Sequence, residues 1–460
     1  MEGVGQFFDA DQKTGAIRWA TRRPCCRQHI HHRHKESMSN SSKSARWGFQ
    51  RFVASSVAEG FLHEPVIMQG ISGAEVSRNG RSYVNFSGIN YLGWQQDARV
   101  LDAFVESARR YGLSTGGSRA TQGICEPHLR LENMLSTLHG KERTLSFASG
   151  MLANIGFINA MTAKFGFSSR SAIDNRDAVL IFDRECHWSL WKAASHLKFG
   201  ESLLAFKHND VTDLTAVLAK LGGRKAIVVF ESLYSSDGSV APIGEILDVC
   251  QRFDALSYID DANGFMVYGS PQRPFHEQFR HMRRADFIMV SLSKSVGLEG
   301  GAISGSAEFI DAFEVLSGTS IFTAAIQPPT ADLAVFIIER LRANPWIMED
   351  YLDRSAMFRL KLQASGLRLN DTASYITSVM IGRDDKAEQV RQALEQQGFC
   401  VPIFRYPAVK PNQALMRLIL HRLHTEPQID RFVASLKDLL GQGASRDAIA
   451  GAEFVGHRQR

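Results

Sequence analysis

At 460 residues the chain exceeds the usual size of one domain, so we expect a large domain with a smaller companion. Apolar residues make up 44% and charged residues 22%, and no uninterrupted apolar stretch reaches the roughly 18 residues that indicate a membrane span. Residues 1–38 hold seven Lys/Arg and four Asp/Glu and so carry most of the formal charge of +5; the nearly neutral remainder argues against nucleic acid as the main partner.

Residues 1–45 are predicted to be a disordered basic head. Within it, Arg22 to Lys35 (RRPCCRQHIHHRHK) packs Cys and His closely, but it lacks a regular zinc-ligand spacing, so disorder is favoured and no metal is expected. Met38 opens a more usual N-terminus, and residues 1–37 are interpreted as an extension or an upstream translation start. The six cysteines have no framework spacing and no secretory signal precedes them, which favours a reducing cytoplasm.

The N-terminal arm is placed at residues 46–94. An amphipathic pattern from Arg46 to about Gly70 predicts a helical segment of the kind that often packs on a partner subunit. The dipeptide Asn79-Gly80 separates two strand-like runs and predicts a short hairpin.

Residues 95–330 are predicted to form the large domain. Short apolar runs alternate there with helical patterns: AVLIF at 178–182, AIVVF at 226–230, LSYI at 256–259 and DFIMV at 286–290. Such runs indicate strands buried on both faces of a mainly parallel sheet, so the fold class is α/β. Ligands of such sheets bind beyond the carboxyl ends of the strands, where the sequence places four polar segments, 183–187, 235–238, 260–264 and 291–294.

A smaller α+β domain is predicted for residues 331–440. A long helical pattern begins at Gln327-Pro328-Pro329 and runs towards Asn344, and a frayed tail is predicted for residues 441–460.

The most informative pair of residues is Lys294 and Asp260. Lys294 lies in Ser291-Leu-Ser-Lys-Ser-Val-Gly297, between small polar residues and a glycine turn, where an amine can form an imine with an aldehyde cofactor. Asp260 ends an apolar strand, and a buried carboxylate there needs a partner such as a pyridinium nitrogen. Taken singly, Lys294 would be interpreted as a surface loop lysine and Asp260 as a helix cap.

Two further segments suit the same cofactor, pyridoxal 5′-phosphate (PLP). His187 follows another strand in FDRECHWSLW and could stack on a flat ring, although alone it would be interpreted as a core histidine. Ser149-Gly150-Met-Leu-Ala-Asn154 opens a helix, whose free backbone N–H groups bind phosphate well.

In order along the chain, these residues resemble the α-oxoamine synthase family of fold-type I PLP enzymes over about residues 78–440. The landmarks are NGRSYVNFSGINYLG at 79–93, GGSRATQG at 116–123, HLRLE at 128–132, SGMLAN at 149–154, FKHND at 206–210, ESLYSSDGSVAP at 231–242, SLSKSVGLEGG at 291–301 and FTAAIQPP at 322–329. The resemblance implies a large domain with a mainly parallel sheet of the seven-stranded type and a small C-terminal α+β domain.

The resemblance also implies roles for individual residues. Lys294, Asp260 and His187 would be catalytic, and the cofactor would further contact Gly150, Met151, Asn154, Ser235, Ser291 and Thr323, with Thr323 reaching the neighbouring subunit of a homodimer. Arg417, seven residues before His424-Thr425, would grip the carboxylate of the amino-acid substrate, a task that its planar fork suits. Asn90 and the region of Ala408 would also contact substrate.

Three positions depart from the family pattern. The Asp-Glu-Ala-His signature is Asp260-Asp261-Ala262-Asn263 here, so an amide that can donate a hydrogen bond but carries no charge replaces the histidine beside the cofactor's phenolic oxygen. Met151 replaces an aromatic residue, and Ala408 stands where many relatives have a substrate-contacting threonine.

The resulting hypothesis is a PLP-dependent acyltransferase that condenses a small amino acid with a medium- or long-chain acyl thioester, on coenzyme A or a carrier protein, to give an α-aminoketone. HWSLWKAA at 187–194 resembles quorum-sensing aminoketone synthases, whereas FRYPAVKPNQALMRL at 404–418 suits serine palmitoyltransferase or 8-amino-7-oxononanoate synthase equally. A PLP aminotransferase and a non-catalytic PLP-binding scaffold are the alternatives from other classes.

Overall fold

The computed structural model describes residues 43–62, 65–406 and 408–455, the last fourteen of them by backbone alone. The described residues group into two units, and the division along the chain falls between Val66 and Ile67. The first contains two helices, α2 (Lys43–Arg46) and α3 (Phe49–Ala58). Most of the basic head, with its candidate metal tract at 22–35 and Met38, lies outside the described residues.

The second unit begins with a small four-stranded sheet in the order β1-β2-β3-β14. Its strands are β1 (Met68–Gln69), β2 (Glu75–Arg78), β3 (Arg81–Asn85) and β14 (Phe399–Cys400). Asn79 and Gly80 join β2 to β3 with φ of 50° and 79°, the left-handed pair that a two-residue hairpin requires. The predicted hairpin is confirmed. β14 joins β3 in parallel and so connects this sheet to the C-terminal part of the chain.

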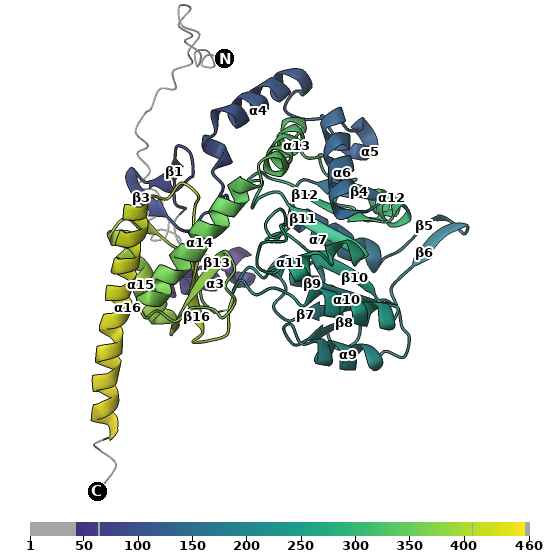
Figure 1. Ribbon diagram of the computed structural model, residues 1–460. Helices are drawn as coiled ribbons and strands as arrows, with labels where there is room; N and C mark the ends of the chain where they lie inside the picture. Colours follow the sequence, from purple (N-terminus) through teal and green to yellow (C-terminus); the bar gives the residue numbers. More distant parts are fainter. Residues whose placement is uncertain (1–42, 63–64, 407, 456–460) are drawn as a thin grey trace, which may run out of the picture. The chain divides into compact units, whose positions relative to one another are not determined.

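A seven-stranded sheet, in the order β4-β12-β11-β10-β9-β7-β8, forms the centre of the second unit (Figure 1). All neighbouring strands pair in parallel except at β12, which is antiparallel to both of its neighbours. The strands are β4 (Arg143–Phe147), β7 (Val179–Asp183), β8 (Leu203–Phe206), β9 (Ala226–Glu231), β10 (Leu256–Asp260), β11 (Phe287–Ser291) and β12 (Gly301–Gly305). The four apolar runs identified in the sequence are β7, β9, β10 and β11, so the predicted α/β sheet is confirmed.

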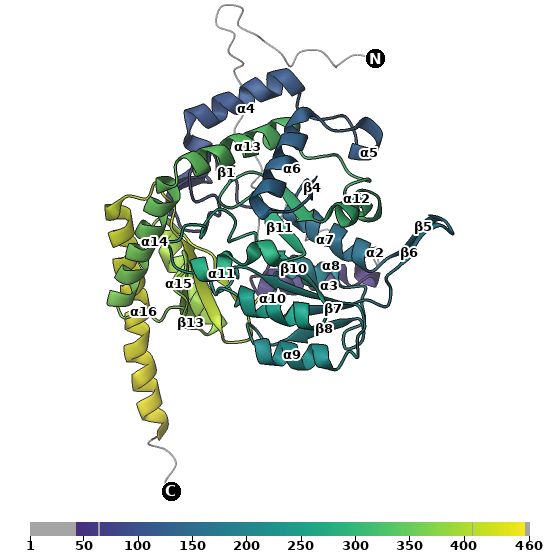
Figure 2. The same cartoon turned by 45° about the vertical axis from the view of Figure 1, so that its right-hand side comes forward.

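Helices cover both faces of this sheet, which is why its strands are apolar along their whole length (Figures 1 and 2). One face packs against α7 (Gly150–Met161), α8 (Trp188–Ala193) and α12 (Ala307–Leu316). The other packs against α6 (Glu126–His139), α9 (Val211–Ala219), α10 (Ile243–Arg252) and α13 (Pro328–Ala343). The remaining elements near the sheet are α4 (Ala98–Tyr111), α5 (Arg119–Gln122), α11 (His276–Phe279) and the two-stranded hairpin β5 (Lys164–Ser168) and β6 (Ser171–Asp174).

The C-terminal residues build a second core around a three-stranded sheet, β13-β16-β15. Its elements are α14 (Trp346–Ala364), β13 (Ile376–Gly382), α15 (Asp384–Gln396), β15 (Ile403–Phe404), β16 (Ala414–Ile419) and α16 (Glu426–Val455). α13 begins at Pro328, as the sequence predicts, whereas α16 continues through Gly441, where the sequence predicts a tail. The domain boundaries drawn from the sequence stay a prediction. Among the described residues no helix is both long and apolar enough to cross a membrane.

Candidate active site

The site is built at the carboxyl edge of the central sheet. Glu231, Asp260 and Ser291 end the neighbouring strands β9, β10 and β11. Asp260 pairs in register with Glu231, and in a parallel sheet register partners project from the same face. Lys294 lies in the turns that follow β11. The sheet therefore brings the predicted lysine and carboxylate to one edge, as the alternation of strands and polar segments predicts.

Asn154, on α7, connects the parts of the site. Its Nδ2 donates to Asp260 Oδ2 (3.1 Å) and to Ser189 Oγ (2.9 Å), and its Oδ1 accepts a hydrogen bond from the Tyr258 hydroxyl (2.6 Å). The side chain is 1% exposed. Because both amide protons and the carbonyl are used, the orientation of the amide is determined by its partners. The positions of Asp260 and of the start of α8 are thus coupled through one side chain.

His187 is the N-cap residue of α8. Its Nδ1 accepts a hydrogen bond from the Ser189 backbone N–H (3.2 Å) and lies 2.8 Å from Ser189 Oγ, so the neutral ring carries its proton on Nε2. Burial lowers the pKa of His187, Asp260 raises it, and Lys294 and Arg417 lower it further. A neutral ring held in this way can lie flat against an aromatic cofactor.

Burial raises the pKa of Asp260, while hydrogen bonds from Asn154 and the Ala262 backbone N–H, and the charges of His187 and Lys294, stabilise its ionised form. A carboxylate that is 3% exposed and faces the site costs free energy unless a cation or a strong donor is present. A protonated pyridine nitrogen provides both.

The surroundings of Lys294 favour its reaction as a nucleophile. Burial lowers its pKa to about 8, nearby Arg417 lowers it as well, and the charge of Asp260 partly offsets the decrease. A larger fraction of the side chain is therefore an uncharged amine at neutral pH than in an exposed lysine, and only the uncharged amine attacks a carbonyl group.

The start of α7 can hold a phosphate. Ser149 caps the helix by accepting from the Leu152 N–H, which leaves the backbone N–H groups of Gly150 and Met151 available. Glycine is required at Gly301, because a Cβ there would lie 2.6 Å from Gly150 Cα. The fit at Gly150 is tight, since a Cβ there would lie 3.2 Å from Ser291 Cβ. The helix terminus is thus held directly over the ends of β11 and β12.

Arg417 reaches the site from β16 in the C-terminal core. Its Nη1 donates to the Ser235 carbonyl oxygen (3.2 Å), its guanidinium lies 4.7 Å from the centre of the Phe404 ring, and its Nε has no hydrogen-bond partner among the described residues. Burial lowers its pKa. A buried guanidinium that contacts a carbonyl oxygen and a ring face retains the capacity to bind a carboxylate.

The other predicted site residues are held by their own local contacts. Asn263 Nδ2 donates to the Leu233 carbonyl (3.3 Å), and Asn90 Nδ2 donates to the Ser72 carbonyl (3.2 Å). Ser291 Oγ lies 2.9 Å from Ser293 Oγ, and Thr323 is half-buried in the loop before α13. Ala408 is exposed, and its backbone N–H donates to the Arg405 carbonyl (2.8 Å).

Glu231 was not singled out from the sequence. It is 2% exposed, its Oε1 has no partner among the described residues, and burial together with the charge of Asp260 raises its pKa well above the usual range. The signal that identified Asp260, a carboxylate directly after a buried strand, is present here too, in AIVVF followed by Glu231. Ser189 and Tyr258, which orient His187 and Asn154, had no sequence signal of this kind.

The residues present fit PLP, because the geometry meets three separate requirements of that group. These are the amine of Lys294 with its lowered pKa, the buried carboxylate of Asp260 and the N-terminus of α7, all at the carboxyl edge of the sheet. In addition, the ring of His187 is joined through Ser189 to the hydrogen bonds that hold Asp260. In the described part of the chain no group of three or more His, Cys, Asp and Glu side chains could hold a metal ion.

Comparisons with known proteins agree with the fold. Residues 81–436 match the family described as aminotransferase class I and II. The 8-amino-7-oxononanoate synthase of Alcanivorax borkumensis is 30% identical over 80% of this chain and 92% of that protein. The 5-aminolevulinate synthase of Bradyrhizobium diazoefficiens is 32% identical over 77% of this chain and 85% of that protein. A serine palmitoyltransferase structure from S. paucimobilis superposes with a TM-score of 0.76 over 86% of this chain and 98% of that one, at 24% identity.

The fold and the site thus define a PLP-dependent transferase of fold type I. The chain belongs to the class I and II aminotransferase family, and within it to the α-oxoamine synthases, which are acyltransferases.

Proposed function

We propose that this enzyme condenses a small amino acid with a medium- or long-chain acyl thioester to give an α-aminoketone. A carbon–carbon bond forms between the amino acid's α-carbon and the acyl carbon, the amino acid's carboxylate leaves as carbon dioxide, and the sulfur leaves as a thiol after taking up a proton. The acyl group could arrive on coenzyme A or on a carrier protein.

The observation that favours this reaction is the position of Arg417. The guanidinium lies close enough to lower the pKa of both Lys294 and His187, and it makes no ion pair with a described carboxylate. An amino acid whose amine is at Lys294 would place its carboxylate at Arg417, because the two cations are neighbours. Bidentate binding there would orient the α-carbon bonds relative to the cofactor plane.

PLP, when bound, supplies an electron sink that stabilises a carbanion at the α-carbon. Lys294 Nζ would hold the cofactor and, once released by the amino acid, would take the α-proton. Asp260 would keep the ring nitrogen protonated, while Asn154 holds the Asp260 carboxylate in place (3.1 Å). His187 would cover one face of the ring and, through its stacking, exclude water from it.

Around these groups, the backbone of Gly150 and Met151 would bind the phosphate, with Ser291 nearby. Ser235 and Asn263 would contribute hydrogen bonds at the ring, and Asn90 and the loop of Ala408 would face the substrates. We propose a homodimer in which Thr323 reaches the phosphate in the neighbouring subunit. The exposed side chain beside it, Phe322 (87%), is consistent with a surface that a partner covers.

Among acyl acceptors and donors, we favour a small amino acid and a medium or long acyl chain, which would make the product a precursor of an α-hydroxyketone quorum-sensing signal. The support is the resemblance of HWSLWKAA at 187–194 to synthases of that kind. Activities like those of serine palmitoyltransferase or 8-amino-7-oxononanoate synthase are the close alternatives within the family.

The test is a product analysis. Purified protein loaded with PLP is incubated with a panel of small amino acids, each labelled at the carboxyl carbon, and acyl thioesters of increasing chain length. We expect labelled carbon dioxide, free thiol and an α-aminoketone by mass spectrometry in equal amounts. Lys294→Ala should abolish all three and the visible absorbance of the loaded protein.

Two results would contradict the proposal. A keto acid formed without release of carbon dioxide would indicate an aminotransferase. Protein that binds PLP but forms no product with any pair, and shows no amino-acid-dependent spectral change, would indicate a non-catalytic scaffold.

A further inference from the structure

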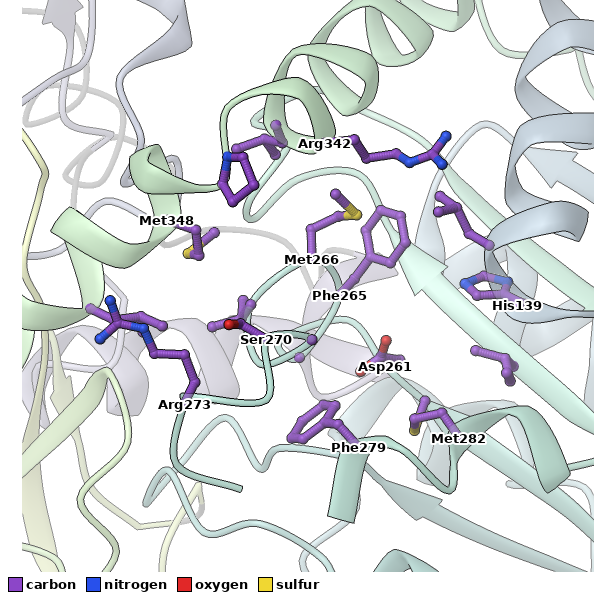
Figure 3. Close-up of a pocket in the computed structure, with 18 of the residues that line it drawn as sticks. His139, Asp261, Phe265, Met266, Ser270, Arg273, Phe279, Met282, Arg342 and Met348 are labelled. Atoms are coloured by element: carbon purple, nitrogen blue, oxygen red, sulfur yellow. The ribbon is translucent and has the colours of Figure 1, made fainter. Parts of the chain in front are cut away.

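A cavity lies on the face of the sheet that α6 and α13 cover, opposite the face that carries α7 and Asn154. Asp260 ends β10, and Asp261, the residue directly after it, lines this cavity of about 490 Å³. Its walls come from the end of α6, the segment that follows β10, and the junction of α13 with α14 (Figure 3). A volume of this size is within the range of small-molecule sites.

Most of the lining is apolar and adaptable. The apolar side chains are Leu138, Phe265, Met266, Val267, Phe279, Met282, Ile288, Leu341, Met348 and Leu352. Three of them are methionines, whose flexible side chains adjust to a ligand of variable shape. Met266 adopts φ of 63°, a conformation that a non-glycine residue rarely takes up and that costs free energy. Its side chain is directed into the cavity from this strained position (Figure 3).

Two buried polar groups face the same space. His139 is 7% exposed, its Nδ1 contacts Ser304 Oγ (2.7 Å), and its Nε2 has no partner among the described residues. Burial lowers the pKa of His139 to about 3, so the ring is neutral. Asp261 accepts a hydrogen bond from Ser232 Oγ, and burial raises its pKa to about 8, so it is protonated at neutral pH. The buried end of the cavity therefore has unused hydrogen-bonding capacity without a net charge.

Cationic side chains stand at the rim. Arg342 and Arg283 are exposed and form no ion pair within the described chain. In Figure 3 Arg342 extends over the cavity towards the helix that carries His139. The acidic residue of the rim, Glu349, lies near Arg273, which is itself paired with Asp353 (2.5 Å). The rim at Arg342 and Arg283 is thus positive, and an anion there would have no competing carboxylate.

We propose that this cavity binds an anionic amphiphile, a medium-chain carboxylate whose chain lies among the apolar side chains and whose head group meets Arg342 and Arg283. The site is separate from the one at Asp260. Ile288 of the lining belongs to the core under α6 and α13, whereas Tyr258, which shares a strand face with Asp260, belongs to the core under α7. It does not depend on the proposed reaction, and its test uses binding instead of turnover.

Binding is measured by titration calorimetry of the full chain loaded with PLP. The probes are hexanoate, octanoate and decanoate, with 1-decanol as the uncharged analogue. We expect saturable binding of decanoate that strengthens by roughly three- to fourfold for each added methylene, the increment for burying a CH₂ group. Absence of decanoate binding, or no dependence on chain length, would overturn the proposal.

Gly269→Phe tests the location. An ideal Cβ on Gly269, which lines the cavity, meets no atom within 4 Å, so the ring has space to enter without displacing the backbone. We expect decanoate affinity to fall at least tenfold. Gly441→Phe is the matched control, because a Cβ there also meets nothing and Gly441 lies on α16, away from the lining. Unchanged binding in Gly269→Phe, or loss of binding on Arg417→Ala instead, would place the ligand elsewhere and refute the site.

Arg342→Ala tests the charge. Removing one exposed cation should weaken decanoate about two- to fivefold and leave 1-decanol unaffected. Arg109→Ala, an exposed helical arginine on α4, should change neither ligand. Equal effects of Arg342→Ala on decanoate and decanol would contradict an anionic head group at this rim.

Discussion

The carboxamide of Asn154 donates a hydrogen bond to the carboxylate of Asp260, with 3.1 Å between Nδ2 and Oδ2. The two residues are 106 positions apart and come from a helix and a strand that meet only in the folded chain. Because Asn154 also binds Ser189 and Tyr258, its amide cannot rotate away, and the direction of the Asp260 carboxylate is fixed from one side.

Asn154→Ala should weaken PLP binding about 10- to 100-fold. The variant removes a donor to a charged acceptor, an interaction of about 1.5–3 kcal/mol, and leaves Asp260 poorly oriented. Fluorescence titration with PLP measures the change. Asn133→Ala, an exposed position on α6, is the control. Wild-type affinity in Asn154→Ala would show that the hydrogen bond does not position the carboxylate.

Lys294 should react with an amine-labelling reagent with a midpoint near pH 8 in the PLP-free protein. Its lowered pKa means that the reactive uncharged amine appears as the pH rises through about 8. Competitive labelling with mass spectrometry gives the profile, with the exposed Lys220 as the internal comparison. A midpoint above pH 10 would contradict the burial and the influence of Arg417.

Glu231→Gln should leave the labelling midpoint of Lys294 unchanged. It should also leave the PLP affinity at pH 7 within about threefold of wild type. Burial and the charge of Asp260 raise the pKa of Glu231 well above the usual range, which favours its neutral carboxyl, and glutamine is a neutral group of similar shape. Competitive labelling of Lys294 in the PLP-free variant measures the midpoint. A clear fall in the midpoint would mean that an ionised Glu231 had been raising the pKa of Lys294.

Arg417→Ala should raise the KM for the amino acid about 10- to 100-fold, with PLP affinity nearly unchanged, because it removes charged hydrogen bonds to the carboxylate alone. Arg417→Lys should recover only part of the loss, since an ammonium group lacks the planar fork. Arg252→Ala is the control, because Arg252 also stacks on a phenylalanine ring but lies on α10. An effect on kcat alone would argue against carboxylate binding.

Asp261→Asn should change how stability depends on pH. The folded-state pKa of Asp261, about 8, lies above its unfolded value, so the favourable contribution of the protonated carboxyl is complete below about pH 4 and is lost as the pH rises through 8. Wild type should therefore lose unfolding free energy relative to Asp261→Asn between pH 4 and pH 8. Urea denaturation at several pH values measures the unfolding free energy of both proteins. If the two free energies changed in parallel with pH, a raised pKa of Asp261 would be excluded.

Several parts of the fold could be predicted from the sequence because their signals are local. AVLIF, AIVVF, LSYI and DFIMV are too apolar for a strand with one wet face, so burial on both faces followed from composition. Asn79-Gly80 specified its hairpin because only a few residues adopt positive φ without strain. The placement of Lys294 and Asp260 at one edge followed from the parallel strands that precede them.

What only the tertiary structure decided was which of these side chains meet and how each is charged. The face of α7 that carries Asn154 reaches Asp260 because the close approach of Gly150 and Gly301 sets the helix against the sheet. The pKa of Glu231 is raised and that of Lys294 is lowered because each is enclosed by distant segments that exclude water. Sequence patterns record local backbone preference and periodicity, whereas burial and electrostatic coupling arise only when remote segments pack together.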